Sequence, residues 1–218
     1  MKQFLVVGLG RFGTSVASTL FENDESILAL DKNEDIVQES INNNLIDNGI
    51  TVDATDMNTL KNLGVSNFDV AFVCIGTNIQ DSILITLNLK ELGIPKIIAK
   101  ALTEAHGKVL KKIGADEIIF PEVYMGQRVA LKEIDPNILE HIKFSDKHIL
   151  VEIKAPNKFY GKTLEKLALR KKYNINIIGI KRSDKELEIN PMGDTKIENG
   201  DTLIAITDSK TAKELEEL

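Results

Sequence analysis

The sequence predicts an α/β protein in which a doubly wound parallel sheet is followed by a small α+β domain. From residue 1 to about residue 121, short apolar runs alternate with longer amphipathic segments. The runs are continuous in Val, Ile and Leu, as expected of strands that are covered on both faces. After about residue 145 the strands and helices become shorter and follow no such alternation, which predicts the second domain.

Six apolar runs supply the strands of the predicted parallel sheet. In chain order they read FLVV, ILAL, GITV, VAFVCI, KIIAKA and EIIF. The segments between them are long enough for crossover helices, so strands and helices alternate along residues 1–121. This arrangement matches the Rossmann-like, dinucleotide-binding fold.

The segment 122–144 differs from both halves and is interpreted as linker or dimerisation helices. Its apolar positions follow a helical stripe formed by Val123, Met125, Val129, Ala130 and Ile134. The stripe is interrupted at Asp135-Pro136. Because proline disfavours helical geometry in the residue before it, we expect one helix to end there and a short one to follow.

The C-terminal domain is expected to span residues 145–218. The runs HILVEIKA, NINIIGIKR, LEINP and DTLIAITD predict strands. Thr163 is a candidate cap for the short helix LEKLALRKKY, and Asn199-Gly200 predicts a tight turn. The final segment, SKTAKELEEL, predicts an amphipathic helix.

Composition excludes several classes of protein. The chain has 218 residues, a net charge of −6, and Lys and Arg interleaved with acids, which argues against a nucleic-acid partner. The single cysteine, Cys74, stands among apolar neighbours and is expected to be packed in the core of a protein from a reducing compartment. No apolar stretch approaches the roughly 20 residues that span a bilayer. Lys2 is followed by a short strand-like run rather than a signal peptide.

The strongest functional signal is the loop Gly8-Leu9-Gly10-Arg11-Phe12-Gly13, between the first strand and a helix. In such a loop the first glycine permits a tight turn, the second allows phosphates to approach the backbone, and the third allows helix and strand to pack closely. The helix N-terminus then presents free N–H groups to the phosphates.

Asp31 ends the second strand, eighteen residues after Gly13. A carboxylate there would accept hydrogen bonds from ribose hydroxyls and repel a 2′-phosphate, which predicts an adenine nucleotide of the NAD or ATP kind rather than NADP. A simple helix cap is the alternative role for Asp31. Asp53 and Asp56 end the third strand. We expect Asp53 to flank the adenine, whereas Asp56 is read equally as a ligand contact or as a helix cap.

Arg11 is open to two interpretations: a bidentate phosphate ligand, reached from a neighbouring subunit, or a solvated surface arginine. No residues that would transform the nucleotide are evident. His106, His141 and His148 lack metal-ligand spacing and are expected at the surface or an interface, and no Walker lysine follows the loop. We therefore expect a protein that is not an enzyme. The alternative is an NAD-dependent oxidoreductase with an unrecognised substrate site.

The ordered motifs VVGLGRFG, LD, VDATD, VCIGTNIQDSI, KIIAKA and FPE resemble the regulatory subunits of Ktr/Trk potassium uptake systems, in the RCK domain family. GKTL, NIIGIKR and NPMGDTKIENGDTL resemble that family's C-terminal domain. The resemblance covers nearly the whole chain. It departs at Val52, where the family commonly places a glycine.

The resemblance implies a cytoplasmic gating subunit that forms dimers and then an octameric ring. This ring would sit at the inner face of the membrane beneath a KtrB/TrkH-like potassium translocator. It would respond to ATP and ADP, with NAD(H) as a further ligand and Mg²⁺ or Na⁺ beside the nucleotide. The nucleotide site implied is Gly8, Gly10, Arg11, Phe12, Gly13, Asp31, Lys32, Asp53, Ala54, Thr55, Gly76, Thr77, Asn78, Lys100 and Glu122.

Within that set, the resemblance implies particular roles. Arg11 would reach phosphate across the dimer, Asp31 would bind ribose, and Lys100 would lie near the phosphates. Glu122 would face the nucleotide-associated cation. A second ligand, cyclic di-AMP, is implied at a C-terminal dimer interface by the matching region that contains Arg170, Asn174, Ile175 and Pro191, against the alternative of ordinary core and surface positions.

Overall fold

The N-terminal half forms a six-stranded parallel sheet in the order β3-β2-β1-β4-β5-β6. Its strands are β1 (Gln3–Val7), β2 (Ser26–Asp31), β3 (Gly49–Thr51), β4 (Val70–Val73), β5 (Lys96–Lys100) and β6 (Glu117–Ile119). From β1 the chain first adds β2 and β3 on one side and then β4, β5 and β6 on the other. Open α/β sheets form a ligand crevice at such a switch point, at the carboxyl ends of the strands. The predicted doubly wound sheet is confirmed.

The computed structural model describes residues 2–76, 78–134, 138–143, 148–182 and 187–216. By internal contacts the chain divides into two units, Met1–Val123 and Tyr124–Leu218.

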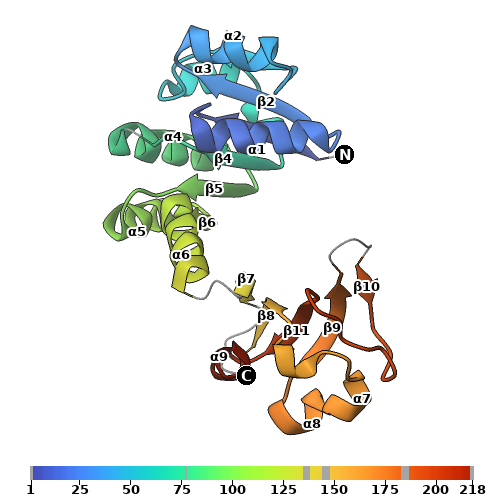
Figure 1. Ribbon diagram of the computed structural model, residues 1–218. Coiled ribbons are helices and arrows are strands. Elements are labelled where there is room, and N and C mark those ends of the chain that lie inside the picture. The colour runs from blue at the N-terminus through green and yellow to red at the C-terminus, as the bar shows by residue number, and fades with distance from the viewer. Residues whose placement is uncertain (1, 77, 135–137, 144–147, 183–186, 217–218) are drawn as a thin grey trace. The chain divides into compact units, whose positions relative to one another are not determined.

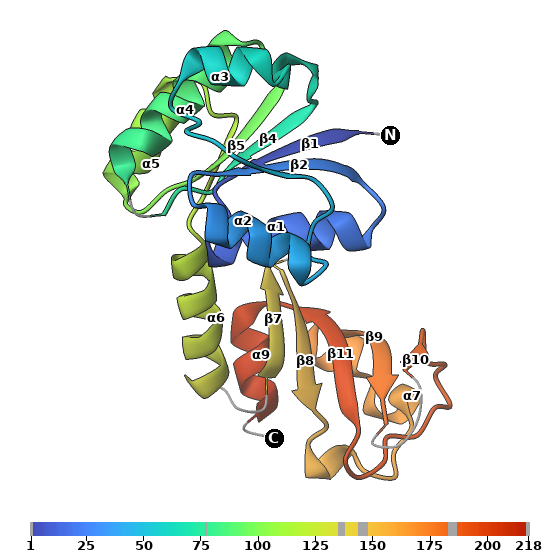
Figure 2. The ribbon, with the colours of Figure 1, turned by 90° about the horizontal axis from the view of Figure 1, so that it is seen from above.

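Helices cover both faces of the parallel sheet (Figures 1 and 2). They are α1 (Arg11–Glu22) and α2 (Glu34–Asn42) on one face, and α3 (Met57–Asn62), α4 (Ile79–Glu91) and α5 (Glu104–Lys112) on the other. Each face buries its own aliphatic core: Ala17, Val37 and Ile46 pack under α1 and α2, whereas Leu60 and Leu89 pack under α3 and α4. These two cores explain the continuous apolar strand sequences.

Helix α6 (Pro121–Ile134) begins in the first unit and continues into the second. Its expected apolar stripe is exposed to solvent in the single chain, since Val123, Met125, Val129 and Ile134 are each more than half accessible.

The second unit contains a five-stranded antiparallel sheet in the order β10-β9-β11-β8-β7. Its elements are β7 (Ile138–Lys143), β8 (Ile149–Lys154), α7 (Leu164–Leu167), α8 (Leu169–Tyr173), β9 (Asn176–Lys181), β10 (Glu188–Ile189), β11 (Thr202–Thr207) and α9 (Ser209–Glu216). Side chains from its helices join one core with the sheet, among them Leu167, Leu169 and Ala212. The small α+β domain is thus confirmed.

Two local predictions in this half were wrong. The short helix expected after Pro136 is the edge strand β7, whose hydrogen bonds to β8 supply a partner that local sequence does not reveal. The segment LEKLALRKKY forms two short helices because Ala168 adopts a left-handed conformation between them. Thr163 does cap the first, accepting a hydrogen bond from the backbone N–H of Lys166.

Candidate functional site

The glycine loop joins β1 to α1 with the geometry that its sequence predicts. Gly8 has a φ of +95°, and a Cβ there would lie 2.9 Å from the Ile75 side chain. A Cβ on Gly13 would collide with the carbonyl oxygen of Gly8, so α1 packs against the loop only because residue 13 has no side chain. A Cβ on Gly10 would meet nothing within 4 Å, which leaves that backbone open to a ligand.

Gly10 is also the N-terminal cap of α1 and has no side chain that could satisfy the first helical N–H groups. These groups therefore point outward without a helical partner, which favours an anion at this position.

Asp31 ties the end of β2 to the glycine loop. Its Oδ2 accepts a hydrogen bond of 2.6 Å from the backbone N–H of Leu9, and its Oδ1 accepts one of 2.9 Å from the N–H of Asn33. Because a carboxylate oxygen can accept more than one hydrogen bond, both oxygens keep capacity for a ligand. The helix cap of α2 is the neighbouring Asn33 rather than Asp31.

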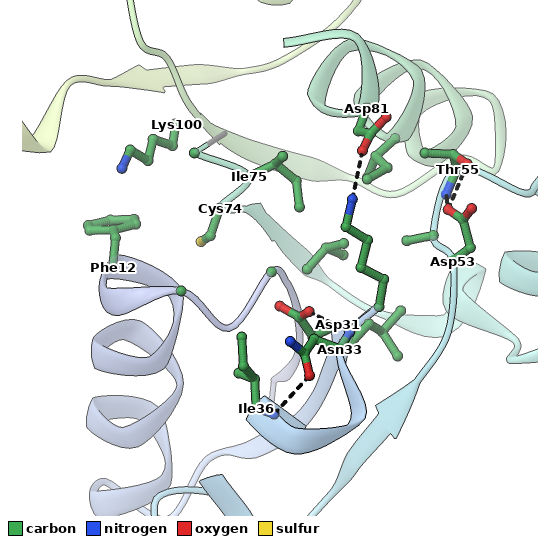
Figure 3. Close-up of a pocket in the computed structure, with 18 of the residues that line it drawn as sticks. Phe12, Asp31, Asn33, Ile36, Asp53, Thr55, Cys74, Ile75, Asp81 and Lys100 are labelled. Atoms are coloured by element: carbon green, nitrogen blue, oxygen red, sulfur yellow. Dashed lines mark hydrogen bonds and ion pairs between the residues drawn. The ribbon is translucent and has the colours of Figure 1, made fainter. Parts of the chain in front are cut away.

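A cavity of about 500 Å³ opens at the carboxyl ends of the strands (Figure 3). Twelve of the expected residues line it: Gly8, Gly10, Arg11, Phe12, Asp31, Lys32, Asp53, Ala54, Thr55, Gly76, Lys100 and Glu122. Gly13 and Asn78 lie outside its lining, the former beneath the loop and the latter as the N-terminal cap of α4. Thr77 lies outside the described residues.

Nine further lining residues were not predicted as part of the site. They are Val7, Leu30, Asn33, Ile36, Val52, Cys74, Ile75, Asp81 and Ile85. Most are apolar and belong to strand ends or helix faces, so only the fold brings them together. Val52 both lines the cavity and packs against the core, and its N–H donates to the carbonyl of Asp31.

The acidic end of the cavity is organised by Asp53, Thr55 and Asp81. Asp53 accepts hydrogen bonds from the hydroxyl and the N–H of Thr55, at 2.6 and 2.9 Å. The Thr55 hydroxyl, then its N–H, and then the charge of Lys32 lower the pKa of Asp53. Asp56 turns away and caps α3, accepting from the N–H groups of Asn58 and Thr59, so the capping interpretation holds for it.

The basic end contains Arg11, Lys100 and Phe12. The Lys100 ammonium group donates to Glu122 Oε1 at 2.6 Å and lies 6.0 Å from the centre of the Phe12 ring. The Lys100 side chain is only 10% exposed, whereas that of Glu122 is 66% exposed. The hydrogen bond from Lys100 lowers the pKa of Glu122, which is therefore ionised at neutral pH. Arg11 is exposed at the first position of α1.

Cys74 and His106, both singled out in the sequence, are buried. Cys74 is packed beneath the glycine loop as expected, and burial raises the pKa of its thiol to about 12. The surface or interface position expected for His106 was wrong: the residue is only 3% exposed because α5 packs it against the loop that follows β5. Its Nδ1 accepts from the N–H of Leu102 at 3.3 Å. The side chain of His141 lies outside what the structure describes, and His148 is exposed.

The residues expected around a second ligand are only partly brought together. Arg170 and Ile175 line a shallow hollow on the second unit, together with residues of α7, α8 and β9. Asn174, the left-handed C-terminal cap of α8, and Pro191 do not line it.

Within the described residues, no group of three or more His, Cys, Asp or Glu side chains is arranged to hold a metal ion. In the same residues, no helix is long and apolar enough to cross a bilayer.

Known proteins resemble the chain along nearly its whole length. The TrkA-N domain family matches residues 4–121 and the TrkA-C domain family matches residues 148–218. Ktr system potassium uptake protein C of Bacillus subtilis (strain 168) is 45% identical over 205 residues, covering 94% of this chain and 91% of that protein. Ktr system potassium uptake protein A of the same organism is 40% identical over 215 residues, covering 99% and 96%.

Solved structures share the fold at low identity. The GsuK channel bound to NAD has a TM-score of 0.55 and 21% identity, covering all of this chain but only 38% of the channel. GsuK bound to ADP has a TM-score of 0.55 and 16% identity over 63% of this chain and 36% of the channel. This chain therefore spans well under half the length of those channel chains.

Proposed function

The chain belongs to the Ktr family of potassium uptake proteins, and we propose that it is the nucleotide-binding regulatory subunit of a potassium translocator. It is built from a TrkA-N and a TrkA-C domain, and its role is gating rather than enzymatic. The observation that carries the nucleotide-binding part is the cavity at the strand ends. A glycine loop and a helix N-terminus meet there, with Asp53 and Asp81 at one end of the cavity and Lys100 at the other.

The residues present fit an adenine nucleotide. A cavity of about 500 Å³ lies within the range of small-ligand sites. Asp31 would accept hydrogen bonds from the ribose hydroxyls, Ala54 and Thr55 would border the base, and the glycine loop with Lys100 would receive the phosphates. NAD and ADP are the ligands described for the GsuK channel, which supports testing both here.

Discrimination between ATP and ADP would fall to Arg11. Its guanidinium is exposed at the start of α1, and no ion pair holds it within the part of the chain that the structure describes. The γ-phosphate of ATP, on the same or a neighbouring subunit, would gain a bidentate partner, and ADP has no γ-phosphate to place there.

A cation beside the nucleotide would be bound by the carboxylate of Glu122. One carboxylate together with phosphate oxygens is a common setting for Mg²⁺. Glu122 is exposed and ionised, and its ion pair with Lys100 would have to loosen as phosphate arrives. Na⁺ would bind to the same oxygens, with one positive charge in place of two.

The subunit would act by population shift, because a ligand changes a conformational equilibrium only through unequal affinity for the two states. Glu122 lies in the first turn of α6, the helix that leads from the first unit into the second. A phosphate that recruits Lys100 would thus change the contacts of that helix. The ring expands or contracts in response and acts on a KtrB/TrkH-like translocator at the cytoplasmic face of the membrane.

Assembly follows from the exposed apolar stripe of α6. More than half of the surface of Val123, Met125, Val129 and Ile134 is accessible, which disfavours an isolated chain in water. A second copy would cover this stripe in a dimer, and dimers would close into an octameric ring. Cyclic di-AMP would bind the C-terminal domain near Arg170 and Ile175, and its contacts with Asn174 and Pro191 would require the partner copy.

The test is calorimetric titration of the nucleotide-free protein with ATP, ADP, NADH and cyclic di-AMP, in Na⁺ and in Mg²⁺. We expect ATP and ADP to bind at micromolar concentrations or below without hydrolysis. Potassium flux into vesicles that contain a Ktr-type translocator should then differ between the ATP and ADP states. Binding of NADH alone, with a nicotinamide absorbance change on turnover, would instead support an oxidoreductase.

A further inference from the structure

An ion pair bridges the acidic end of the cavity. Lys32 follows the last residue of β2, and Asp81 lies in the first turn of α4. Lys32 Nζ lies 3.4 Å from Asp81 Oδ2, the contact drawn as the dashed line at Asp81 in Figure 3. Both residues line the cavity.

The topology places this pair across the crevice rather than beside it. Strand β1 pairs with both β2 and β4, so it lies between the elements that carry the two residues. The Lys32 side chain therefore spans the gap between the end of β2 and the start of α4, on the Asp81 and Thr55 side of the cavity (Figure 3). A ligand in the crevice would lie under this bridge.

The local charges favour a bridge that opens and closes. Lys32 is a single cation among the carboxylates of Asp31, Asp53 and Asp81, and it contributes to the lowered pKa of Asp53. The Lys32 side chain is 70% exposed and that of Asp81 is 25% exposed, so the ion pair is solvated and weak. A nucleoside beneath it would displace water from one side and strengthen the attraction.

We propose that Lys32 and Asp81 form a latch over the nucleoside half of the cavity, which opens to admit an adenine nucleotide and closes over its ribose and base. This inference rests on the proposed nucleotide binding and adds residues that govern its release. The latch lies at the Asp81 and Thr55 end of the cavity, whereas Lys100 and Phe12 lie at the other (Figure 3). It should therefore act alike on every ligand that carries adenosine.

The experiment measures association and dissociation of ADP, ATP and NADH on the immobilised full chain by surface plasmon resonance. We expect Lys32→Ala and Asp81→Asn each to accelerate dissociation about three- to five-fold for all three nucleotides, since exposed pairs contribute modestly. The double variant should dissociate no faster than either single variant, because one interaction is removed in each case. Raising NaCl should accelerate release from the wild type more than from the variants, because only the wild type retains this ion pair, and the difference between their rates should shrink.

The control is the Lys96–Glu117 pair, at 3.3 Å and also solvent-exposed, at the amino ends of β5 and β6. Lys96→Ala and Glu117→Gln should leave every rate unchanged. Unaltered dissociation in Lys32→Ala, or additive effects in the double variant, would overturn the latch while the wild type still binds.

The affinity for NADPH distinguishes a latch role of Lys32 from a role in binding a 2′-phosphate. Tighter binding of NADPH than NADH, abolished by Lys32→Ala, would make Lys32 a ligand of the 2′-phosphate and overturn the latch. A wild-type protein that binds none of these nucleotides would overturn the proposed function and the latch together.

Discussion

Lys100 Nζ lies 2.6 Å from Glu122 Oε1, so an ion pair on the wall of the cavity joins the end of β5 to the first turn of α6. Lys100 is nearly buried and Glu122 is exposed, which makes Glu122 the partner that can leave. A phosphate group that binds Lys100 must compete with this carboxylate.

That competition predicts opposite effects for the two residues. Glu122→Gln should tighten ADP binding in the absence of divalent cations by about three-fold, because Lys100 is then free to meet phosphate. Lys100→Met should weaken it about tenfold, through loss of a charge-assisted contact. Calorimetry with Mg²⁺ should reverse the sign for Glu122→Gln if Glu122 serves the cation. Equal affinities in all three proteins would contradict the competition.

Arg11→Ala should separate ATP from NADH. We expect ATP affinity to fall tenfold or more and NADH affinity to change less than about two-fold, because only ATP offers a free terminal phosphate. Isothermal titration gives both values on one preparation. Lys61→Ala, an exposed lysine near the end of α3, is the control and should change neither. Equal losses for both ligands would exclude recognition of a terminal phosphate by Arg11.

Gly13→Ala and Gly10→Ala should affect different properties. The added Cβ at residue 13 collides with the Gly8 carbonyl, so we expect the free energy of unfolding to fall by about 3 kcal/mol. At residue 10 the Cβ meets nothing and φ is −64°, so stability should fall by no more than about 1 kcal/mol. Nucleotide affinity should nevertheless fall in Gly10→Ala, because the methyl group occupies space near the phosphates. Urea unfolding and titration distinguish the two; a stable Gly13→Ala protein would show that the loop can yield.

The burial of His106 should make the folded protein less stable as the pH falls. Burial lowers its pKa below the ordinary value of 6.5, so the unfolded chain takes up a proton there at a higher pH than the folded chain. Its contribution to stability is therefore complete above about pH 7.5 and is lost as pH falls through 6.5. Protonation would also place a hydrogen on Nδ1, which accepts from the Leu102 N–H.

The measurement is the urea midpoint of the wild type and of His106→Asn between pH 7.5 and 5.5. Asn keeps an acceptor at the Nδ1 position and does not titrate, so its midpoint should depend less on pH even if it is lower throughout. Parallel slopes for wild type and His106→Asn would contradict the assignment.

Backbone requirements explain which parts of the site could be read from sequence. Gly8 and Gly13 stand where a side chain would collide, and Asp31 ends a strand beside the loop, so spacing along one strand–turn–helix predicts their positions. The strand order follows from the same alternation of strands and helices. Their roles toward a nucleotide stay predictions.

Contacts between distant segments could not be predicted in this way. Lys32 and Asp81 are 49 residues apart, and Lys100 and Glu122 are 22 apart, so each pairing depends on where parallel strands end in space. The burial of His106 likewise depends on how α5 packs, and a helical histidine with charged neighbours gives no local sign of it. Strand β7 was missed because its partner β8, rather than its own sequence, determines its conformation.

The position of Cys74 gives the protein an internal reporter. It is the single thiol in the sequence, it is packed under the glycine loop, and burial raises its pKa to about 12. A thiolate attacks an aqueous disulfide reagent only where the reagent can reach it, so the folded protein should react at the rate at which the loop lifts from the sheet. A nucleotide seated on that loop would slow the labelling in proportion to its occupancy. The time course of one chemical modification would then report ligand binding in the unaltered chain, with no engineered probe.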